Sequence, residues 1–330
     1  MTRVTWASMG HCPMRRLAVI HHRHLDWVPN LAAAEPQLEV RGWHPRDLGS
    51  LDPADMAWLS QAEGLFCWKL PPNLMAHMPH LAWVQNSGAG VDHLIAHPDL
   101  PTHIPISRAD GHFGHWMARY VCGHLLARSQ RLEECRAAQA QAQWNPKLLP
   151  EDLRNQKALV VGFGRIGRCI GEALRALGLE VHGVVREVRP DPEFTLLSTQ
   201  DLAAALPTAR LLVLAAPLTS ETRNLVDAEL LRHGHGSLTL INVGRGELVA
   251  VEALLEALDQ GRLGHAVLDV FPEEPLPSTS PLWAHPKVTI TPHHSGPSTP
   301  SDLIPDILPN LRRFADRVPI QDTVDRRRGY

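Results

Sequence analysis

Three side chains that could share one reaction each follow a short apolar run in the second half of the 330-residue sequence. Arg245 lies in INVGRG, Glu274 in LDVFPEEPLP and His293 in TPHH. An arginine can grip a carboxylate or keto oxygen through its planar fork of donors. An imidazolium can donate a proton to that oxygen as a hydride reaches the carbon, and a carboxylate can hold the imidazole and stabilise its charged form. These residue types predict the reduction of a 2-keto acid.

Each of these residues also has an ordinary structural interpretation. Arg245 could form a surface ion pair, Glu274 could be a loop carboxylate before a proline, and His293 could be a turn residue after Thr-Pro. Their shared position favours catalysis, because the carboxyl ends of the strands in a parallel sheet face one crevice.

A glycine-rich turn, VVGFGRIG at residues 160–167, precedes all three. In Gly-x-Gly-x-x-Gly spacing the first glycine allows a tight turn, the second lets backbone approach a pyrophosphate, and the third lets helix and strand pack closely. The helix start also offers N–H groups and a positive dipole end to phosphates. We therefore expect a dinucleotide site, with a purely structural βαβ turn as the alternative. Its residues would be Gly162, Gly164, Arg165, Ile166 and Gly167.

Strand and helix signals alternate along most of the chain, which predicts an α/β fold of two Rossmann-like or flavodoxin-like doubly wound domains. Helical periodicity after residue 297 has no strand beside it and should pack on the first domain. We expect a substrate-binding domain of residues 1–106 and 296–330, and a dinucleotide-binding domain of residues 107–295 that begins with a long helix over 112–140. Strands of the second domain are expected at 159–161, 181–185, 211–215, 238–243, 266–270 and 288–291.

The composition is that of an ordinary globular protein, with 44% hydrophobic residues, 20% charged residues and a net charge of −3. The sequence has no prominent basic patch, so we expect no nucleic-acid partner. No apolar stretch approaches the ~20 residues of a membrane span, so we expect no membrane segment. The five scattered cysteines suggest no disulfide framework, so we expect a cytoplasmic protein. Residues 1–13 read as a loose leader, and either Met1 or Met14 could be the natural start.

Histidine is abundant, with 20 residues, and several lie close in sequence at 21–24, 112–115 and 233–235. No carboxylates accompany these groups at metal-ligand spacing. We interpret them as ordinary core or surface histidines and expect no metal site.

The chain resembles the D-isomer-specific 2-hydroxyacid dehydrogenase family, in particular its glyoxylate/hydroxypyruvate reductase A branch. The resemblance runs from about residue 16 to the end. It is carried by SGAGVDHL, VGFGRIG, PLTSETRNLV, INVGRGELV, LDVFPEEPLP and TPHH, and for the branch by FCWKLP, QWNP, SPLWAHP and VDRRRGY.

This resemblance implies that Arg245, Glu274 and His293 form the catalytic set, and that Arg245 and His293 also contact both cofactor and substrate. Backbone amides of Ala89 and Gly90 would hold the substrate carboxylate, with Trp68 and Lys69 lining the site. Asp269 would contact the nicotinamide carboxamide. Further cofactor contacts are implied for Pro217, Thr222, Val243 and Gly244. The family usually forms homodimers through the nucleotide domain, so the long helix should contribute to a two-fold interface.

The sequence departs from the broad family pattern at the end of the second nucleotide-domain strand. Val185 stands where members that use NAD commonly carry an acid, and Arg186 and Arg189 follow it. Two guanidinium groups can pair with a 2′-phosphate, so NADP is favoured and NAD remains possible. The alternative is a solvated loop that includes Glu187. His294, and the His115-Trp116-Met117 segment, are further departures that could reshape the substrate pocket.

The leading hypothesis is an NADPH-dependent reductase of a small 2-keto acid, with glyoxylate and hydroxypyruvate first and a phenylpyruvate-type acid as an alternative. A dinucleotide-sensing, corepressor-like binding protein could keep the same fold and the same three residues. Oxidation of phosphite or formate is a third possibility on this scaffold. Fold alone does not decide among these functions, and the sequence leaves the physiological keto acid open.

Overall fold

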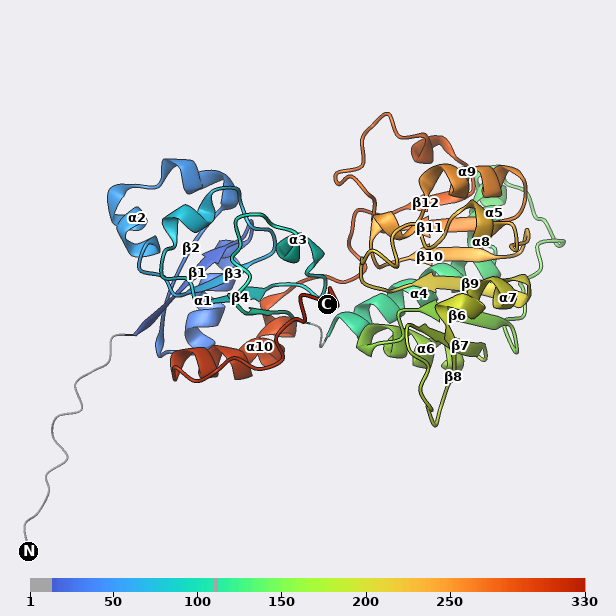
Figure 1. Cartoon of the computed structure of the whole chain (residues 1–330). Coiled ribbons are helices and arrows are strands. Elements are labelled where there is room, and N and C mark those ends of the chain that lie inside the picture. Colours follow the sequence, from blue (N-terminus) through green and yellow to red (C-terminus); the bar gives the residue numbers. More distant parts are fainter. Residues whose placement is uncertain (1–13, 110–111, 330) are drawn as a thin grey trace, which may run out of the picture. The chain divides into compact units, whose positions relative to one another are not determined.

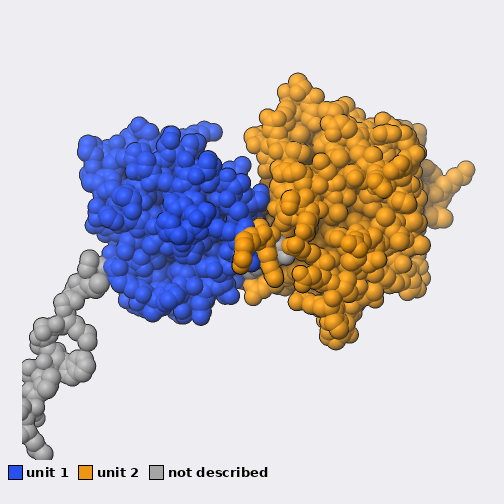
Figure 2. Space-filling view, viewed as in Figure 1, with its two compact units in different colours: residues 1–109, 298–326 blue, residues 110–297, 327–330 orange. Residues whose placement is uncertain are grey.

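The computed structural model describes residues 14–109 and 112–329, and the chain divides into two compact α/β units (Figure 1). Unit 1 comprises residues 1–109 and 298–326, and unit 2 comprises residues 110–297 and 327–330 (Figure 2). The chain passes from unit 1 to unit 2 after residue 109 and returns to unit 1 at residue 298, a few residues later than the expected domain boundaries at 106 and 295. Residues 327–330, which we expected in the first domain, group with unit 2. The expected leader at 1–13 lies outside the described residues.

Unit 1 is built on a five-stranded parallel sheet in the order β2-β1-β3-β4-β5. Its C-terminal helix α10 (Pro300–Ala315) belongs to this unit and buries Phe314, whose ring lies 5.0 Å from that of Trp83. The strands are β1 (Arg15–Ile20), β2 (Leu38–Trp43), β3 (Gly64–Cys67), β4 (Trp83–Asn86) and β5 (Ile106–Ser107). The other helices are α1 (His24–Ala34), η1 (Pro45–Ser50), α2 (Pro53–Leu59), η2 (Leu74–His77) and α3 (Asp92–Ile95).

Unit 2 contains a seven-stranded parallel sheet in the order β12-β11-β10-β9-β6-β7-β8, which confirms the predicted doubly wound α/β class. The strand order reverses between β6 and β9, the position at which such sheets bind ligands. The strands are β6 (Lys157–Val161), β7 (Glu180–Val185), β8 (Thr195–Ser198), β9 (Ala209–Leu214), β10 (Thr239–Asn242), β11 (His265–Leu268) and β12 (Val288–Ile290). The helices are α4 (Phe113–Ser129), α5 (Leu132–Ala140), α6 (Arg165–Ala176), η3 (Thr199–Asp201), α7 (Leu202–Ala205), η4 (Leu206–Thr208), α8 (Ala228–Leu231), η5 (Gly246–Leu248), α9 (Val251–Asp259) and η6 (Pro281–Ala284).

The prediction of a single long helix over 112–140 is wrong, because this segment forms two helices, α4 and α5. Arg131 adopts a left-handed conformation with φ 54° at the break. The buried face of α4 ends at Ser129, whereas α5 buries none of its described residues and so lacks the packing that would keep the two segments collinear.

Within 14–109 and 112–329, no helix is both long enough and apolar enough to cross a membrane.

Candidate active site

The loops that follow β9, β10 and β11 pack against one another at the carboxyl edge of the unit 2 sheet. A Cβ atom on Gly244, after β10, would lie 2.9 Å from the carbonyl oxygen of Ala216, after β9. Gly246 approaches the backbone of Phe271 and Pro272, after β11, so closely that no side chain fits there. Glycine at 246 therefore lets the Arg245 turn lie directly against the loop that carries Glu274.

Arg245 is held by its own turn. The side-chain amide of Asn242, the last residue of β10, donates to the Arg245 carbonyl at 2.8 Å, and its oxygen accepts from Gly244 N at 3.0 Å. Nη1 of Arg245 donates to the Gly244 carbonyl at 2.9 Å. Asn242 is 1% exposed. Sequence reasoning missed its role, although an amide ending the apolar strand TLIN is a visible signal.

Glu274 and His293 form a pair. Nδ1 of His293 lies 2.8 Å from Oε2 of Glu274, and the other carboxylate oxygen accepts from Phe271 N at 3.0 Å. The imidazole and carboxylate are partly exposed, at 34% and 28%. An imidazole fixed through Nδ1 presents Nε2 as its second ring nitrogen, and this is the arrangement that a general acid requires.

Asp269 is fully buried and organises the segment that carries His293. Its Oδ1 accepts from Thr291 Oγ1 at 2.5 Å and from His294 N at 3.0 Å, and its Oδ2 accepts from Ser295 N at 2.9 Å. Its carbonyl accepts from His293 N at 2.8 Å. His293 has φ 50°, a left-handed conformation costing on the order of 1 kcal/mol or more, so these contacts hold a strained residue in place.

The glycine turn fits a dinucleotide. Gly162 has φ 88°, and a Cβ atom there would lie 2.5 Å from the Ala216 backbone, so only glycine makes this turn. A Cβ on Gly164 would meet nothing within 4 Å, which leaves the loop open on that side. Arg165 begins α6 and is exposed, Ile166 is half-buried and Gly167 is buried in the first turn. The turn thus has the cradle and the helix start that a pyrophosphate needs.

The 217–222 turn follows the strand β9 beside this cradle. The Thr222 hydroxyl donates to the Pro217 carbonyl at 2.7 Å and accepts from Thr219 N at 2.8 Å, so it closes the turn from within. Val243 is buried after β10. Gly329 approaches Thr219, because a Cβ atom on this glycine would lie 3.3 Å from the Thr219 methyl group. The C-terminal residues therefore reach the same turn.

Arg186 and Arg189 follow β7, which ends at Val185 as expected. Arg186 is 52% exposed, and its Nη2 donates to Oε1 of Glu221 at 2.8 Å. Arg189 is exposed. Both guanidinium groups therefore follow the strand end at which a ribose 2′ substituent is expected to lie, and the exposed Glu187 stands between them in the sequence.

The expected substrate-wall residues all lie in unit 1. Ala89 and Gly90 belong to a turn after β4 that is held by Asn86, whose Nδ2 donates to the Gly88 and Gly90 carbonyls, each at 2.9 Å. Trp68 follows β3, packs against Gly88 and contacts the His93 ring at 4.9 Å between centroids. Lys69 is exposed. Sequence reasoning missed Asn86, which is fully buried and shapes this turn.

The histidines lie in several different environments, and the rings of His21 and His22 stack with their centroids 4.3 Å apart. Across residues 14–109 and 112–329, no group of three His, Cys, Asp or Glu side chains is arranged to hold a metal ion. Burial lowers the pKa of His21 to about 3 and that of His265 to about 4, with smaller contributions from neighbouring positive groups. These two rings are therefore uncharged at neutral pH.

Residues 122–295 match the family model described as D-isomer specific 2-hydroxyacid dehydrogenase, NAD binding domain. The chain is also 34% identical over 312 residues to glyoxylate/hydroxypyruvate reductase A of Salmonella typhi, covering 92% of this chain and 96% of the relative. The chain belongs to the D-isomer specific 2-hydroxyacid dehydrogenase family. It is an NAD(P)-dependent dehydrogenase of that family.

Solved members of this family have the same fold. A D-isomer specific 2-hydroxyacid dehydrogenase from Xanthobacter autotrophicus Py2, in complex with NADPH and MES, matches with a TM-score of 0.85 and 33% identity over 96% of this chain and 100% of that one. An NADPH-dependent glyoxylate/hydroxypyruvate reductase from Sinorhizobium meliloti, in complex with NADP and sulfate, matches with a TM-score of 0.81 and 29% identity, again over 96% and 100%.

Proposed function

We propose that this dehydrogenase uses NADPH to reduce small 2-keto acids, glyoxylate to glycolate and hydroxypyruvate to D-glycerate. The observation that carries the proposal is the His293–Glu274 pair, at 2.8 Å, on the sheet edge that also carries the glycine turn. The reductase relatives from Salmonella typhi and Sinorhizobium meliloti support the choice of substrates and coenzyme.

In this mechanism the chain aligns the substrate and supplies a proton. Arg245 binds the substrate carboxylate or keto oxygen through its guanidinium and polarises the carbonyl. His293, held at Nδ1 by Glu274, donates the proton from Nε2 to the carbonyl oxygen, and Glu274 stabilises the imidazolium beforehand. A bound dinucleotide would supply the hydride.

The coenzyme would be held mainly by the glycine turn, through Gly162, Gly164, Arg165, Ile166 and Gly167. Arg186 and Arg189 would pair with the 2′-phosphate of NADP, and NAD would bind more weakly because it lacks that phosphate. Further contacts are proposed for Pro217, Thr222, Val243, Gly244 and Asp269. Since both carboxylate oxygens of Asp269 accept from the 291–295 segment, any contact with the nicotinamide carboxamide would share these acceptors.

Unit 1 would complete substrate binding. We assign the substrate carboxylate to the backbone amides of Ala89 and Gly90, in the turn that Asn86 holds. Trp68 and Lys69 would line the same subsite.

The test is oxidation of NADPH, followed at the reduced-nicotinamide absorbance band, with glyoxylate, hydroxypyruvate, pyruvate and phenylpyruvate. We expect turnover with glyoxylate and hydroxypyruvate and a higher kcat/KM with NADPH than with NADH. Turnover of phenylpyruvate alone would favour the alternative of a phenylpyruvate-type keto acid reductase. NADPH binding without turnover of any of the four acids would contradict the proposal and favour a dinucleotide-sensing binding protein.

We also propose that the protein is a cytoplasmic homodimer. The four described cysteines are free thiols, as in a reducing compartment.

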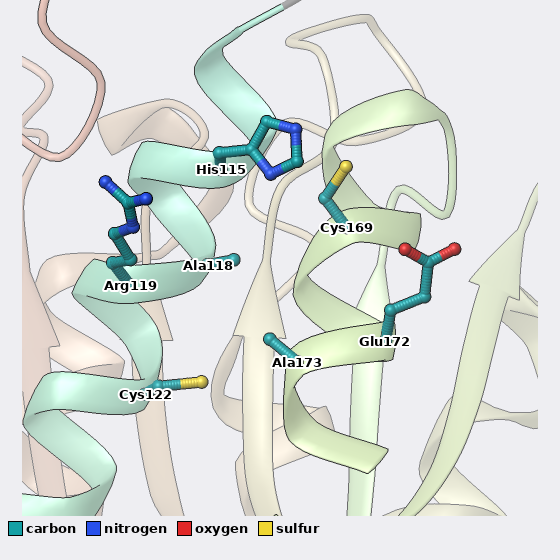
Figure 3. Close-up of a pocket in the computed structure, with 7 residues that line it drawn as sticks. All are labelled: His115, Ala118, Arg119, Cys122, Cys169, Glu172 and Ala173. Carbon is teal, nitrogen blue, oxygen red and sulfur yellow. The ribbon is translucent and has the colours of Figure 1, made fainter. Parts of the chain in front are cut away.

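A shallow pocket of about 320 Å³ lies between α4 and α6, with His115 and Arg119 on one side and Cys169 and Glu172 on the other (Figure 3). A second copy seated on this face through α4 would cover it, and light scattering tests the two-fold state.

A further inference from the structure

We propose that Tyr120, acting through Thr291, is a positioning residue that fixes His293 for proton transfer. This inference rests on the proposed function of His293 as the proton donor, and it adds a residue that lies in α4, far from the catalytic loops in sequence. It is carried by an unbroken series of hydrogen bonds from α4 to the His293 segment.

The direction of each hydrogen bond follows from the groups involved. Oγ1 of Thr291 lies 2.5 Å from Asp269 Oδ1 and 2.6 Å from the Tyr120 hydroxyl. A carboxylate only accepts, so the single Thr291 proton points to Asp269. The Tyr120 hydroxyl must then donate to Thr291.

Tyr120 is suited to act as a permanent donor. Burial raises the pKa of its phenol well above the ordinary range, an effect that the hydrogen bond with Thr291 only partly offsets and to which the negative charge of Asp269 adds. The phenol therefore keeps its proton at every pH at which the enzyme is expected to work. Its ring lies 4.4 Å from that of His124, one helical turn along, and 5.8 Å edge-on from that of His294.

The far end of this series is the turn that holds His293. The same Asp269 oxygen that accepts from Thr291 also accepts from His294 N, and its partner oxygen accepts from Ser295 N. The hydrogen bond from Thr291 thus helps to fix the rotation of the Asp269 carboxylate, which in turn accepts from the backbone of residues 294 and 295. His293 is in the left-handed region at φ 50°, so a loosened anchor lets it relax away from Glu274.

Tyr120→Phe tests this role, because phenylalanine keeps the ring packing and removes only the hydroxyl. We expect kcat for hydroxypyruvate to fall by about tenfold, the size of one ordinary hydrogen bond, while KM for NADPH stays within about twofold. Thr291→Val should give a similar loss, and Thr291→Ser should recover most of the activity because it keeps the hydroxyl. The control is Thr289→Val, which removes a hydroxyl of β12 that bonds His265 of β11 at 2.9 Å, and it should leave kcat unchanged.

A double mutant separates positioning from general stability. If Tyr120 acts through Thr291, adding Tyr120→Phe to Thr291→Val causes no further loss of kcat. Losses that multiply, or a Tyr120→Phe enzyme with unchanged kcat, would overturn the proposal.

A second readout needs neither coenzyme nor turnover. Amide hydrogen exchange of the peptide spanning 291–296 should be faster in Tyr120→Phe than in the unmodified protein, and unchanged in Thr289→Val. If the protein reduced none of the tested keto acids but this exchange still increased in Tyr120→Phe, the proposed function would be wrong, while the role of Tyr120 in holding the 291–295 segment would be supported. Unchanged exchange in Tyr120→Phe would overturn the anchor itself.

Discussion

His293 Nδ1 lies 2.8 Å from Glu274 Oε2, and the second carboxylate oxygen of Glu274 is fixed by Phe271 N. The imidazole orientation is therefore set by a carboxylate that is itself held by the backbone. Glu274→Gln keeps the shape of the side chain but removes the charge that stabilises an imidazolium. We expect it to lower kcat by roughly 10²-fold, and His293→Ala by roughly 10²- to 10⁴-fold, because proton transfer is lost.

Glu273→Gln is the matched control for this prediction, since Glu273 is the preceding, exposed carboxylate of the same loop. It should leave kcat within about twofold, a difference too small to reflect a lost catalytic interaction. NADPH affinity, measured by the fluorescence of the bound coenzyme, should be similar in all three variants. A His293→Ala enzyme with normal kcat would exclude this histidine as the proton donor.

Arg245 should act mainly on the substrate. Arg245→Lys keeps the positive charge but loses the planar fork, so we expect KM for hydroxypyruvate to rise by about tenfold or more, with a smaller fall in kcat. Steady-state kinetics at saturating NADPH measure this separation. Arg262→Lys, at an exposed position of unit 2, is the control and should change neither constant. If KM stayed constant in Arg245→Lys, the planar guanidinium of Arg245 would not contribute to substrate binding.

The ion pair between Arg186 and Glu221, 2.8 Å apart, should weaken the selection of NADPH. Glu221 neutralises the guanidinium that we assign to the 2′-phosphate and would repel that phosphate. Glu221→Gln should therefore lower KM for NADPH by a few-fold and leave KM for NADH unchanged, in line with the modest energy of an exposed pair. The double variant Arg186→Ala/Arg189→Ala should raise KM for NADPH but not for NADH.

Glu229→Gln is the control for charge alone, because Glu229 is an exposed carboxylate of the same unit at the start of α8. It should leave both coenzyme constants unchanged. Equal changes in the NADPH and NADH constants in Glu221→Gln would argue against a 2′-phosphate site at Arg186.

The sequence was most informative where the backbone itself imposes the residue. The turn at Gly162 needs a positive φ, and the strand ends at Val185 and Asn242 follow apolar runs that could be located from their pattern. The sequence did not predict strands β2 and β8, because LEVRGW and TLLS are only partly buried and lack a continuous apolar run, or β5, which spans only two residues. The break at Arg131 carried no glycine or proline signal, since it arises where the buried face of α4 ends.

Side-chain networks were not predictable in the same way. Tyr120 and Thr291 are hydrogen-bonded although 171 residues separate them, and no periodicity relates the two positions. Asp269 was assigned to the cofactor from the family resemblance, whereas the fold adds the contacts through which it holds the 291–295 segment. Such contacts depend on how helices pack on the sheet, so they follow from the fold and not from local sequence.

The two buried histidines His21 and His265 should make the protein acid-sensitive. Burial lowers their pKa values to about 3 and about 4, from an ordinary 6.5. Below pH 6.5 the unfolded chain binds a proton at each site while the folded chain does not, so stability falls with pH until the folded-state values are reached. Between pH 7 and pH 5 each site should cost roughly 2 kcal/mol of unfolding free energy.

Calorimetric unfolding temperatures between pH 7 and pH 5 measure this dependence. His265→Gln removes one titrating group, so its unfolding temperature should fall less over this interval than that of the unmodified protein, even if it starts lower. His103→Gln, at an exposed histidine, is the control and should keep the original slope. A His265→Gln slope equal to that of the unmodified protein would mean that His265 takes up its proton equally well in the folded and unfolded chains, which its 4% exposure argues against.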